Sequence, residues 1–199
     1  RETATISMTD LELSSKETIT CAIIADTHIP DRVRELHPEL VNKLISLQPR
    51  LIIHAGDISH PRVIAELEQF APVYAVRGNR DWLFTKTLPL NRTFLLNNRR
   101  VFLTHGHLNF HQYWKDKMDN LLLGYNFERY SRRLLAFAPD ANVLLFGHSH
   151  HAECRNQAGV FFMNPGSCSV AEKPDHQLSF GIIRFSPGGI VSGELVRLN

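Results

Sequence analysis

Short apolar runs alternate with segments of helical periodicity in the first half of the chain. The runs at 20–25, 51–55 and 73–76 are continuous and too short for helices, which predicts strands buried on both faces. Between them, segments that begin at Pro38 and Pro61 repeat apolar residues every three or four positions and therefore predict helices. This β-α-β-α-β order predicts a largely parallel sheet with right-handed crossovers.

The second half of the chain has the pattern of strands joined by turns. Asn97-Asn98 separates apolar runs at 93–96 and 101–104 and predicts a hairpin. A parallel beginning followed by antiparallel hairpins predicts an α/β fold of two stacked sheets with helices outside. Further strands are expected at 142–146, 153–155, 160–163, 178–185 and 190–198.

Two segments fit this pattern less well. Residues 1–19 are polar, and we interpret them as an N-terminal extension to a single domain at 20–199. Residues 108–138 are aromatic and basic, and they predict one or two helices over the mouth of a site formed by the strand ends. The alternative is that these aromatic side chains only pack against the sheet.

Composition narrows the classes of partner and compartment. Apolar residues make up 43% and charged residues 21% of the 199 positions, which is typical of a globular domain. The formal net charge is +2 and the basic residues are scattered, so neither a nucleic-acid-binding stripe nor a membrane-binding patch is expected. No apolar run is long enough to span a membrane. Three cysteines without CxxC spacing favour a reducing, cytoplasmic location, and the sequence leaves a homo-oligomer open.

Residue types that bind metals recur directly after the predicted strands. The candidate ligands are Asp26, His28, Asp57, Asn79, His105, His148 and His150. They exceed the roughly four to six ligands that one ion uses, but they suit two ions that share a carboxylate. For any single histidine, the alternative is a hydrogen-bonded core or surface imidazole. We accept that alternative for His54, His60, His111, His151 and His176.

Five short motifs follow one another in the order found in calcineurin-like metallophosphoesterases. They are Asp26-x-His28, Gly56-Asp57-x-x-His60, Gly78-Asn79-x-Asp81, His105-Gly106-His107 and Gly147-His148-x-His150. The chain therefore resembles that superfamily over roughly residues 20–198. The stretches at 25–32 and 164–167 resemble its small bacterial and archaeal phosphodiesterase branch. The resemblance implies a four-layer α-β-β-α sandwich of two mixed sheets with helices outside.

The resemblance also implies a dinuclear metal site and a role for each ligand. Asp57 would bridge two divalent transition-metal ions, with Mn²⁺ favoured and Fe, Ni²⁺, Co²⁺ or Zn²⁺ also compatible. A hydroxide bridging the ions would attack phosphorus directly and in line, so we expect a phosphoesterase that prefers diesters to monoesters. By resemblance, one ion would be bound by Asp26, His28 and His150, and the other by Asn79, His105 and His148.

One position departs from the wider family, in which histidine often follows the Gly-Asn pair. Arg80 stands at this position. Arginine binds phosphate oxygens but cannot act as a general acid. His107 is a candidate acid by position only, and an ordinary loop histidine is its alternative. The residues expected to act in catalysis are thus Asp57, Asn79, Arg80 and His107.

A second class of function shares the same fold. The retromer subunit of this family resembles a protein-interaction scaffold whose metal site is used weakly or not at all. Such a scaffold need not keep the ligand set. All seven ligand positions hold competent residue types in this chain, which favours a phosphoester-cleaving enzyme over a metal-binding scaffold.

Overall fold

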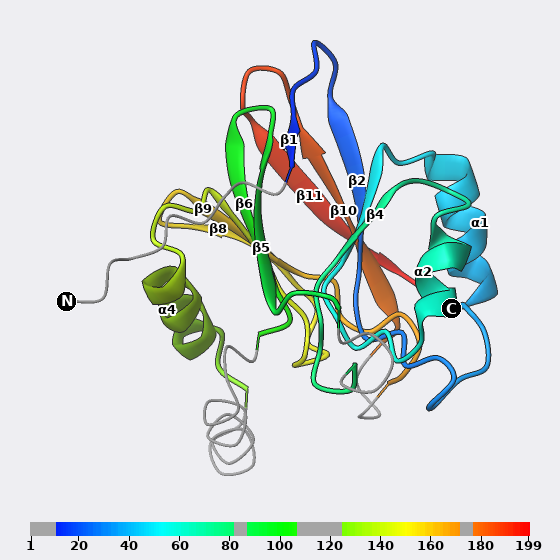
Figure 1. The fold of residues 1–199 in the computed structure, drawn as a ribbon. Helices are drawn as coiled ribbons and strands as arrows, with labels where there is room; N and C mark the ends of the chain where they lie inside the picture. Colours follow the sequence, from blue (N-terminus) through cyan, green and yellow to red (C-terminus); the bar gives the residue numbers. More distant parts are fainter. Residues whose placement is uncertain (1–10, 82–86, 107–124, 172–176) are drawn as a thin grey trace.

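The predicted β-α-β-α-β unit is present and belongs to a five-stranded sheet. The computed structural model describes residues 11–81, 87–106, 125–171 and 177–199 (Figure 1). The unit and its hairpin comprise β2 Ile19–Ile24, α1 Pro38–Leu47, β3 Leu51–His54, α2 Pro61–Leu67, β4 Val73–Ala75, β10 Ser179–Phe185 and β11 Val191–Arg197. Strands β2, β3 and β4 pair in parallel, as their continuous apolar runs predict. Strand β10 pairs antiparallel with both β2 and β11, which gives the order β11-β10-β2-β3-β4.

The remaining strands form a six-stranded sheet with the order β1-β5-β6-β7-β9-β8. Their bounds are β1 Glu12–Leu13, β5 Asn91–Leu96, β6 Arg99–Thr104, β7 Val143–Leu145, β8 Glu153–Gln157 and β9 Val160–Asn164. The predicted hairpin is confirmed, because β5 and β6 pair antiparallel around Asn97 and Asn98. These two residues have φ angles of 44° and 61°, and two consecutive positive φ angles are what a type I′ hairpin turn requires.

Three buried apolar clusters of described residues separate four layers. Between the sheets, Ile23 of β2 belongs to the same cluster as Phe94 of β5. The next residue, Ile24, faces the other way and belongs to the cluster beneath α1 and α2. The third cluster joins the six-stranded sheet to helix α4 (Phe127–Phe137) and includes Tyr130 and Phe162. The expected α-β-β-α sandwich is therefore confirmed, with α4 on one side and α1 and α2 on the other (Figure 1).

Helix α4 shows what part of the aromatic segment does. Phe127 and Tyr130 are buried against the six-stranded sheet, as the packing interpretation of this segment expects. The ring of Phe127 contacts that of Phe162 edge-on, with centroids 5.4 Å apart. Residues 107–124 lie outside the described residues, so a helix over the mouth of the site stays a prediction there.

The end of the predicted N-terminal extension contributes to the fold. Glu12 and Leu13 form β1, which pairs in parallel with β5 at the edge of the six-stranded sheet. Residues 1–10 lie outside the described part of the chain. The boundary of the extension at residue 19 therefore stays a prediction.

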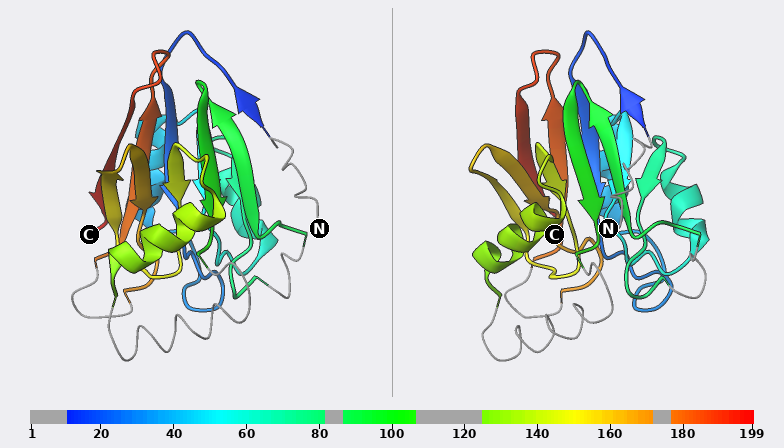
Figure 2. Two further views of the ribbon diagram at one scale, coloured as in Figure 1. Left: turned by 90° about the vertical axis from the view of Figure 1, so that its left-hand side faces the viewer. Right: turned by 60° about the vertical axis from the view of Figure 1, so that its left-hand side comes forward.

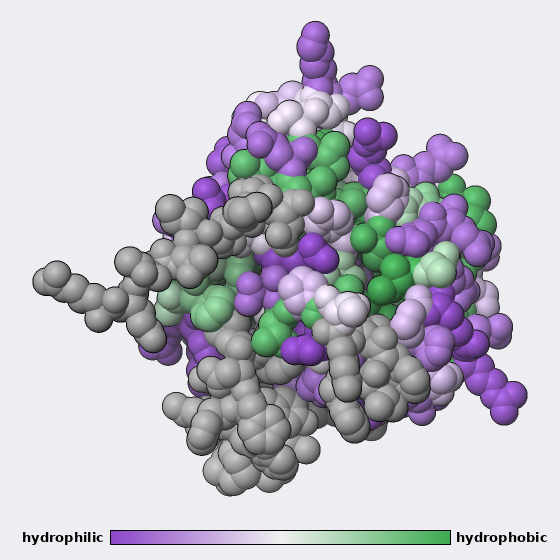
Figure 3. Space-filling model, in the orientation of Figure 1, coloured by the Kyte–Doolittle hydropathy of each residue, from purple (hydrophilic) through white to green (hydrophobic). Residues whose placement is uncertain are grey.

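Large exposed apolar side chains are scattered over the described surface. They are Ile45 on α1, Phe137 on α4 and Ile190 beside the turn between β10 and β11. On the face drawn in Figure 3, hydrophobic residues likewise appear in separate groups among hydrophilic ones. Among the described helices, none has both the length and the apolar character needed to cross a membrane.

Candidate metal centre

The carboxyl ends of five strands meet at one end of the sandwich. Strands β2, β3 and β4 are parallel in one sheet, and β6 and β7 are parallel in the other. All seven candidate ligands lie in the segments that follow these strands, and short distances link them into one group. The candidate ligands predicted from strand ends are thus brought together, although their binding of metal stays a prediction.

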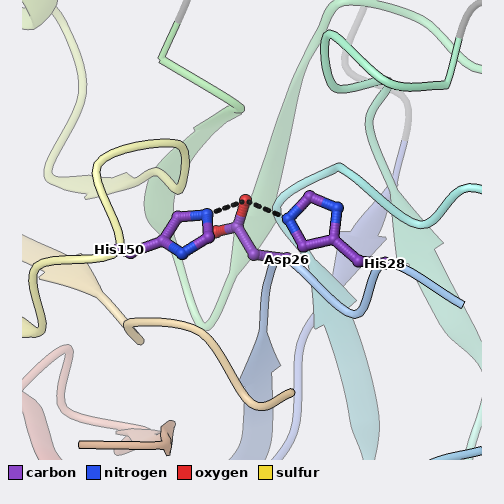
Figure 4. A group of neighbouring side chains, drawn as sticks. All are labelled: Asp26, His28 and His150. Carbon is purple, nitrogen blue, oxygen red and sulfur yellow. Dashed lines mark ion pairs between the residues drawn. The ribbon is translucent and has the colours of Figure 1, made fainter. Parts of the chain in front are cut away.

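Asp26, His28 and His150 form the first group of ligand atoms (Figure 4). Asp26 Oδ1 lies 3.3 Å from His150 Nε2 and 3.8 Å from His28 Nε2. The carboxylate of Asp26 is fully buried, and neither of its oxygens accepts a hydrogen bond from the described residues. Burying an ionised carboxylate without such partners is costly, so a bound cation fits this position.

Asn79, His105 and His148 form the second group. The amide oxygen of Asn79 lies 3.1 Å from His105 Nε2 and 3.0 Å from His148 Nδ1. The other ring nitrogen of His105, Nδ1, lies 2.7 Å from the carbonyl oxygen of Ala55. Donation from Nδ1 to this carbonyl leaves Nε2 as the nitrogen that faces Asn79, the arrangement usual for a metal-binding histidine.

Asp57 lies between the two groups. Its Oδ1 is 3.5 Å from His105 Nε2, and its Oδ2 is 3.9 Å from His28 Nε2. Oδ1 also accepts the backbone N–H of Arg80 at 2.8 Å. The two oxygens of one carboxylate therefore face different histidines, one from each group.

The charges of this cluster depend on one another. Burial alone would lower the pKa of His105, but the Asp57 carboxylate and its other partners raise it to about 9. Burial likewise would raise the pKa of Asp57, yet the imidazole of His105 holds it below its usual range. Burial lowers the pKa of His28, which keeps that imidazole neutral and able to bind a metal.

The backbone of the centre is tightly constrained. A Cβ atom on Gly78 would lie 2.1 Å from Asp57 Oδ1 and 2.2 Å from its backbone nitrogen, so only glycine fits. Left-handed φ angles, which cost non-glycine residues about 1 kcal/mol or more, cluster here. Five candidate ligands adopt them, namely Asp26, His28, Asp57, His148 and His150. Such strain persists where the surrounding fold imposes it, as it commonly does at functional sites.

Asp81 is the residue that sequence reasoning missed. Its buried carboxylate accepts four backbone N–H groups: Oδ2 accepts from Asp57 at 2.9 Å and Gly78 at 2.7 Å, and Oδ1 accepts from Ile58 at 2.9 Å and Ser59 at 2.7 Å. Burial raises the pKa of Asp81, while these donors favour its ionised form. The Gly78-Asn79-x-Asp81 motif was the available signal, but it does not reveal which groups converge on its last residue.

Other histidines have the structural roles expected of them. His54 is fully buried, its Nε2 lies 3.2 Å from Thr27 Oγ1, and its Nδ1 accepts the Gly56 N–H at 3.2 Å. Burial lowers its pKa to about 3. The side chain of His60 caps α2, and the ring of His151 stacks on another ring. His111 and His176 lie outside the described residues.

Arg80 and His107 are the two predicted catalytic residues without a metal-binding role, and the structure describes only Arg80. Arg80 is exposed beside the centre, next to Asn79 and hydrogen-bonded through its backbone to Asp57. His107 lies outside the described residues. A catalytic role for either one stays a prediction.

Comparison with known proteins identifies the family. The model of the calcineurin-like phosphoesterase superfamily domain matches residues 19–187, which include all seven candidate ligands. The chain belongs to this superfamily. The family predicted from five motifs is thereby confirmed, and membership together with the ligand groups indicates a site for divalent metal.

Individual relatives place the chain within the superfamily. A probable metallophosphoesterase of Methanothermobacter thermautotrophicus is 33% identical over 175 residues, 88% of this chain and 90% of the relative. Phosphodiesterase YfcE of Escherichia coli is 30% identical over 118 residues, 56% of this chain and 52% of that protein. The structure of Vacuolar Protein Sorting 29 from Cryptosporidium parvum has a TM-score of 0.70 at 18% identity, covering 92% of this chain and 99% of that one. The small bacterial and archaeal branch is thus confirmed, and the last comparison concerns the fold alone.

Proposed function

We propose that this protein is a metal-dependent phosphodiesterase with a dinuclear centre. The observation that carries the proposal is the placement of Asp57, whose Oδ1 and Oδ2 face His105 and His28 at 3.5 Å and 3.9 Å. A carboxylate with one oxygen toward each of two ligand groups is suited to bridge two cations. Similarity to the curated phosphodiesterase YfcE supports a diester as the substrate.

Each ion has its own set of protein ligands in this proposal. Oxygen and imidazole donors without thiolates suit Mn²⁺, which we favour, and also Fe, Ni²⁺, Co²⁺ or Zn²⁺. Two observations support such binding: the buried oxygens of Asp26 accept no hydrogen bond from the described residues, and Ala55 orients His105. Asp26, His28 and His150 would hold one ion, Asn79, His105 and His148 the other, and Asp57 both.

Residues of the chain orient the substrate around this centre. Bound divalent ions would supply Lewis acidity toward the phosphoryl oxygens and an activated water as nucleophile. The backbone N–H of Arg80 donates to Asp57 and its side chain is exposed, which supports a role for its guanidinium in binding phosphoryl oxygens. Because arginine keeps its proton, Arg80 does not protonate the leaving group, and His107 is the alternative acid that the dependence of rate on leaving-group pKa tests.

A protein-interaction scaffold is the second candidate function. The similarity in fold to Vacuolar Protein Sorting 29 favours it. The chain keeps seven candidate ligand residues at one site, with Asp26 and His105 fully buried there. A scaffold does not require this arrangement, so we favour the enzyme.

The proposal is tested by assaying the metal-loaded protein on phosphomonoesters, phosphodiesters and pyrophosphates. We expect turnover of diesters, and at least about a 100-fold loss in Asp57→Asn, which should exceed the loss in His148→Ala. Metal content of each variant is measured in parallel. Asp140→Asn, at an exposed turn position, is the matched control and should keep wild-type activity. Metal binding without turnover of any ester would instead favour the scaffold.

A further inference from the structure

A pocket of about 390 Å³ lies beside the metal centre, at the edge of the sandwich. Ser179 at the start of β10 pairs with Arg197 at the end of β11. Gly181 pairs with Ile23 of β2, so this end of the hairpin lies at the same end of the sheet as Asp26. In Figure 2, β11 and β8 lie side by side at the sandwich edge. The lining residues include His150, His151, Gln177, Ser179, Leu195 and Arg197.

The pocket adjoins the candidate metal centre at one residue. His150 lines the pocket, and its Nε2 lies 3.3 Å from Asp26 Oδ1 in the first ligand group. The neighbouring His151 forms a wall, because its ring stacks on Tyr125 with centroids 4.2 Å apart. The pocket is therefore the neighbouring space for a ligand whose phosphoryl group is held at the centre. The volume suits a group the size of a sugar phosphate.

The described residues that line the pocket include one permanent positive charge. No acidic side chain is among the described residues that line it, and Arg197 supplies a permanent cation. The side chain of Arg197 is exposed and makes no ion pair with the described residues. Arg184 on the same hairpin provides a contrast, since its guanidinium donates to Glu194 at 2.8 Å. Arg197 is thus available to a ligand, whereas Arg184 is already paired.

We propose that this pocket binds a second phosphate group of the diester substrate through Arg197. This second phosphate is carried by the alcohol that stays esterified after cleavage. This inference rests on the proposed phosphodiesterase function and narrows its substrate class. A guanidinium forms charge-assisted, often bidentate hydrogen bonds to phosphate. Substrates of this class are diesters that carry a further phosphate on the retained alcohol, as phosphorylated nucleosides do.

Two esters that differ only in this phosphate test the proposal. They are thymidine 5′-(p-nitrophenyl phosphate) and its 3′-phosphorylated form, both of which release p-nitrophenolate. For the Mn²⁺-loaded wild type we expect kcat/KM to be about tenfold higher for the 3′-phosphorylated ester, mainly through KM. In Arg197→Gln this ratio should fall to near one, and Arg197→Lys should retain part of it. Arg184→Gln is the matched control and should keep the wild-type ratio.

A binding measurement separates failure of this inference from failure of the proposed function. Calorimetry compares thymidine 3′,5′-bisphosphate with thymidine 5′-monophosphate on the Mn²⁺-loaded wild type and Arg197→Gln. We expect tighter binding of the bisphosphate by the wild type alone. Cleavage of both esters with a ratio that Arg197→Gln does not change would overturn the pocket assignment only. If neither ester is cleaved, the proposed phosphodiesterase function is refuted. Equal affinities of the wild type and Arg197→Gln for the bisphosphate would then also refute phosphate binding in the pocket.

Discussion

Asp81 accepts the backbone N–H of Asp57 at 2.9 Å, across 24 residues of sequence. The same carboxylate accepts the N–H of Gly78, so it ties the loop after β3 to the loop after β4. The backbone of Asp57, whose side chain faces both ligand groups, is thus held in place by the carboxylate of Asp81. The precision of the centre depends on a residue outside the ligand set.

Replacing Asp81 with asparagine should loosen this backbone. The amide has one acceptor oxygen, so its NH₂ group must face two of the four N–H donors that Asp81 now accepts. We expect Asp81→Asn to lower the free energy of unfolding by about 3 kcal/mol and to weaken metal binding about tenfold or more. Urea unfolding of the metal-free protein and metal titration measure the two effects.

A neighbouring carboxylate provides the control for that experiment. Asp31 Oδ2 accepts the hydroxyl of Ser59 at 2.7 Å, its one hydrogen bond from the described residues, and Asp31 lies at the exposed surface. Asp31→Asn should therefore cost about 1 kcal/mol or less and leave metal affinity at the wild-type level. Wild-type metal affinity in Asp81→Asn would contradict a role for Asp81 in positioning Asp57.

The candidate ligands were predictable because their signal is local. Each follows its strand by a few residues, and parallel strands bring their carboxyl ends to one edge, so position along the chain implies position in space. The apolar sequence of β2 also predicted a buried strand. Its neighbouring residues Ile23 and Ile24 face different apolar clusters, so both faces of the strand are covered. An uninterrupted apolar run therefore predicts a strand covered on both sides.

Features that depend on distant segments could not be predicted in the same way. The role of Asp81 depends on N–H groups from two loops, and the pocket at Arg197 depends on β11 lying near His151. Strand β1 has only two residues, too few for any periodicity, and its pairing with β5 follows from tertiary contact. The hydrophobic pattern within one segment does not indicate which distant segments it contacts.

Metal removal tests the assignment of the ligand set. Exhaustive chelation should abolish activity, and Mn²⁺ or a neighbouring divalent ion should restore it, because oxygen and imidazole donors discriminate poorly among these ions. Metal affinity should fall as the pH is lowered, since a protonated imidazole has no lone pair for a metal. Metal content and turnover are measured together from pH 5 to pH 8. Full activity in a protein shown to contain no metal would refute the mechanism.

Because of Cys21, the free energy of unfolding should decrease as the pH rises above neutral. Burial raises the pKa of this thiol far above its ordinary value, so the folded protein keeps the proton while the unfolded chain loses it above about pH 8.5. The folded state then binds more protons, and stability must fall as the pH rises. We expect Cys21 to contribute a loss of about 1.4 kcal/mol per pH unit above pH 8.5.

Variants isolate this contribution from other titrating groups. Urea unfolding between pH 7.5 and pH 10 should show a smaller pH slope for Cys21→Ala than for the wild type. Cys154→Ala serves as the comparison, because that thiol is only partly buried on β8 and should change the slope less. Identical slopes for wild type and Cys21→Ala would show that the buried thiol is not protonated selectively in the folded state.

Arg80 should determine how the rate depends on the leaving group. Its guanidinium stabilises phosphoryl charge but gives no proton, and general acid catalysis is typically worth about 10²–10⁴-fold. An aryl diester leaves as a stable phenolate and needs little protonation, whereas an alkyl diester leaves as a strongly basic alkoxide. We therefore expect wild-type rates to decrease steeply as the leaving-group pKa rises.

Two substitutions at the same position separate charge stabilisation from proton donation. Arg80→Ala should slow every substrate by a similar factor and leave the slope of rate against leaving-group pKa nearly unchanged, because it removes charge alone. Arg80→His introduces an imidazole that is able to donate a proton, so the slope should become shallower. Rates for a series of aryl and alkyl diesters give the slope for each protein. A flat wild-type line would mean that another acid already protonates the leaving group, and His107→Ala should then make the slope steep.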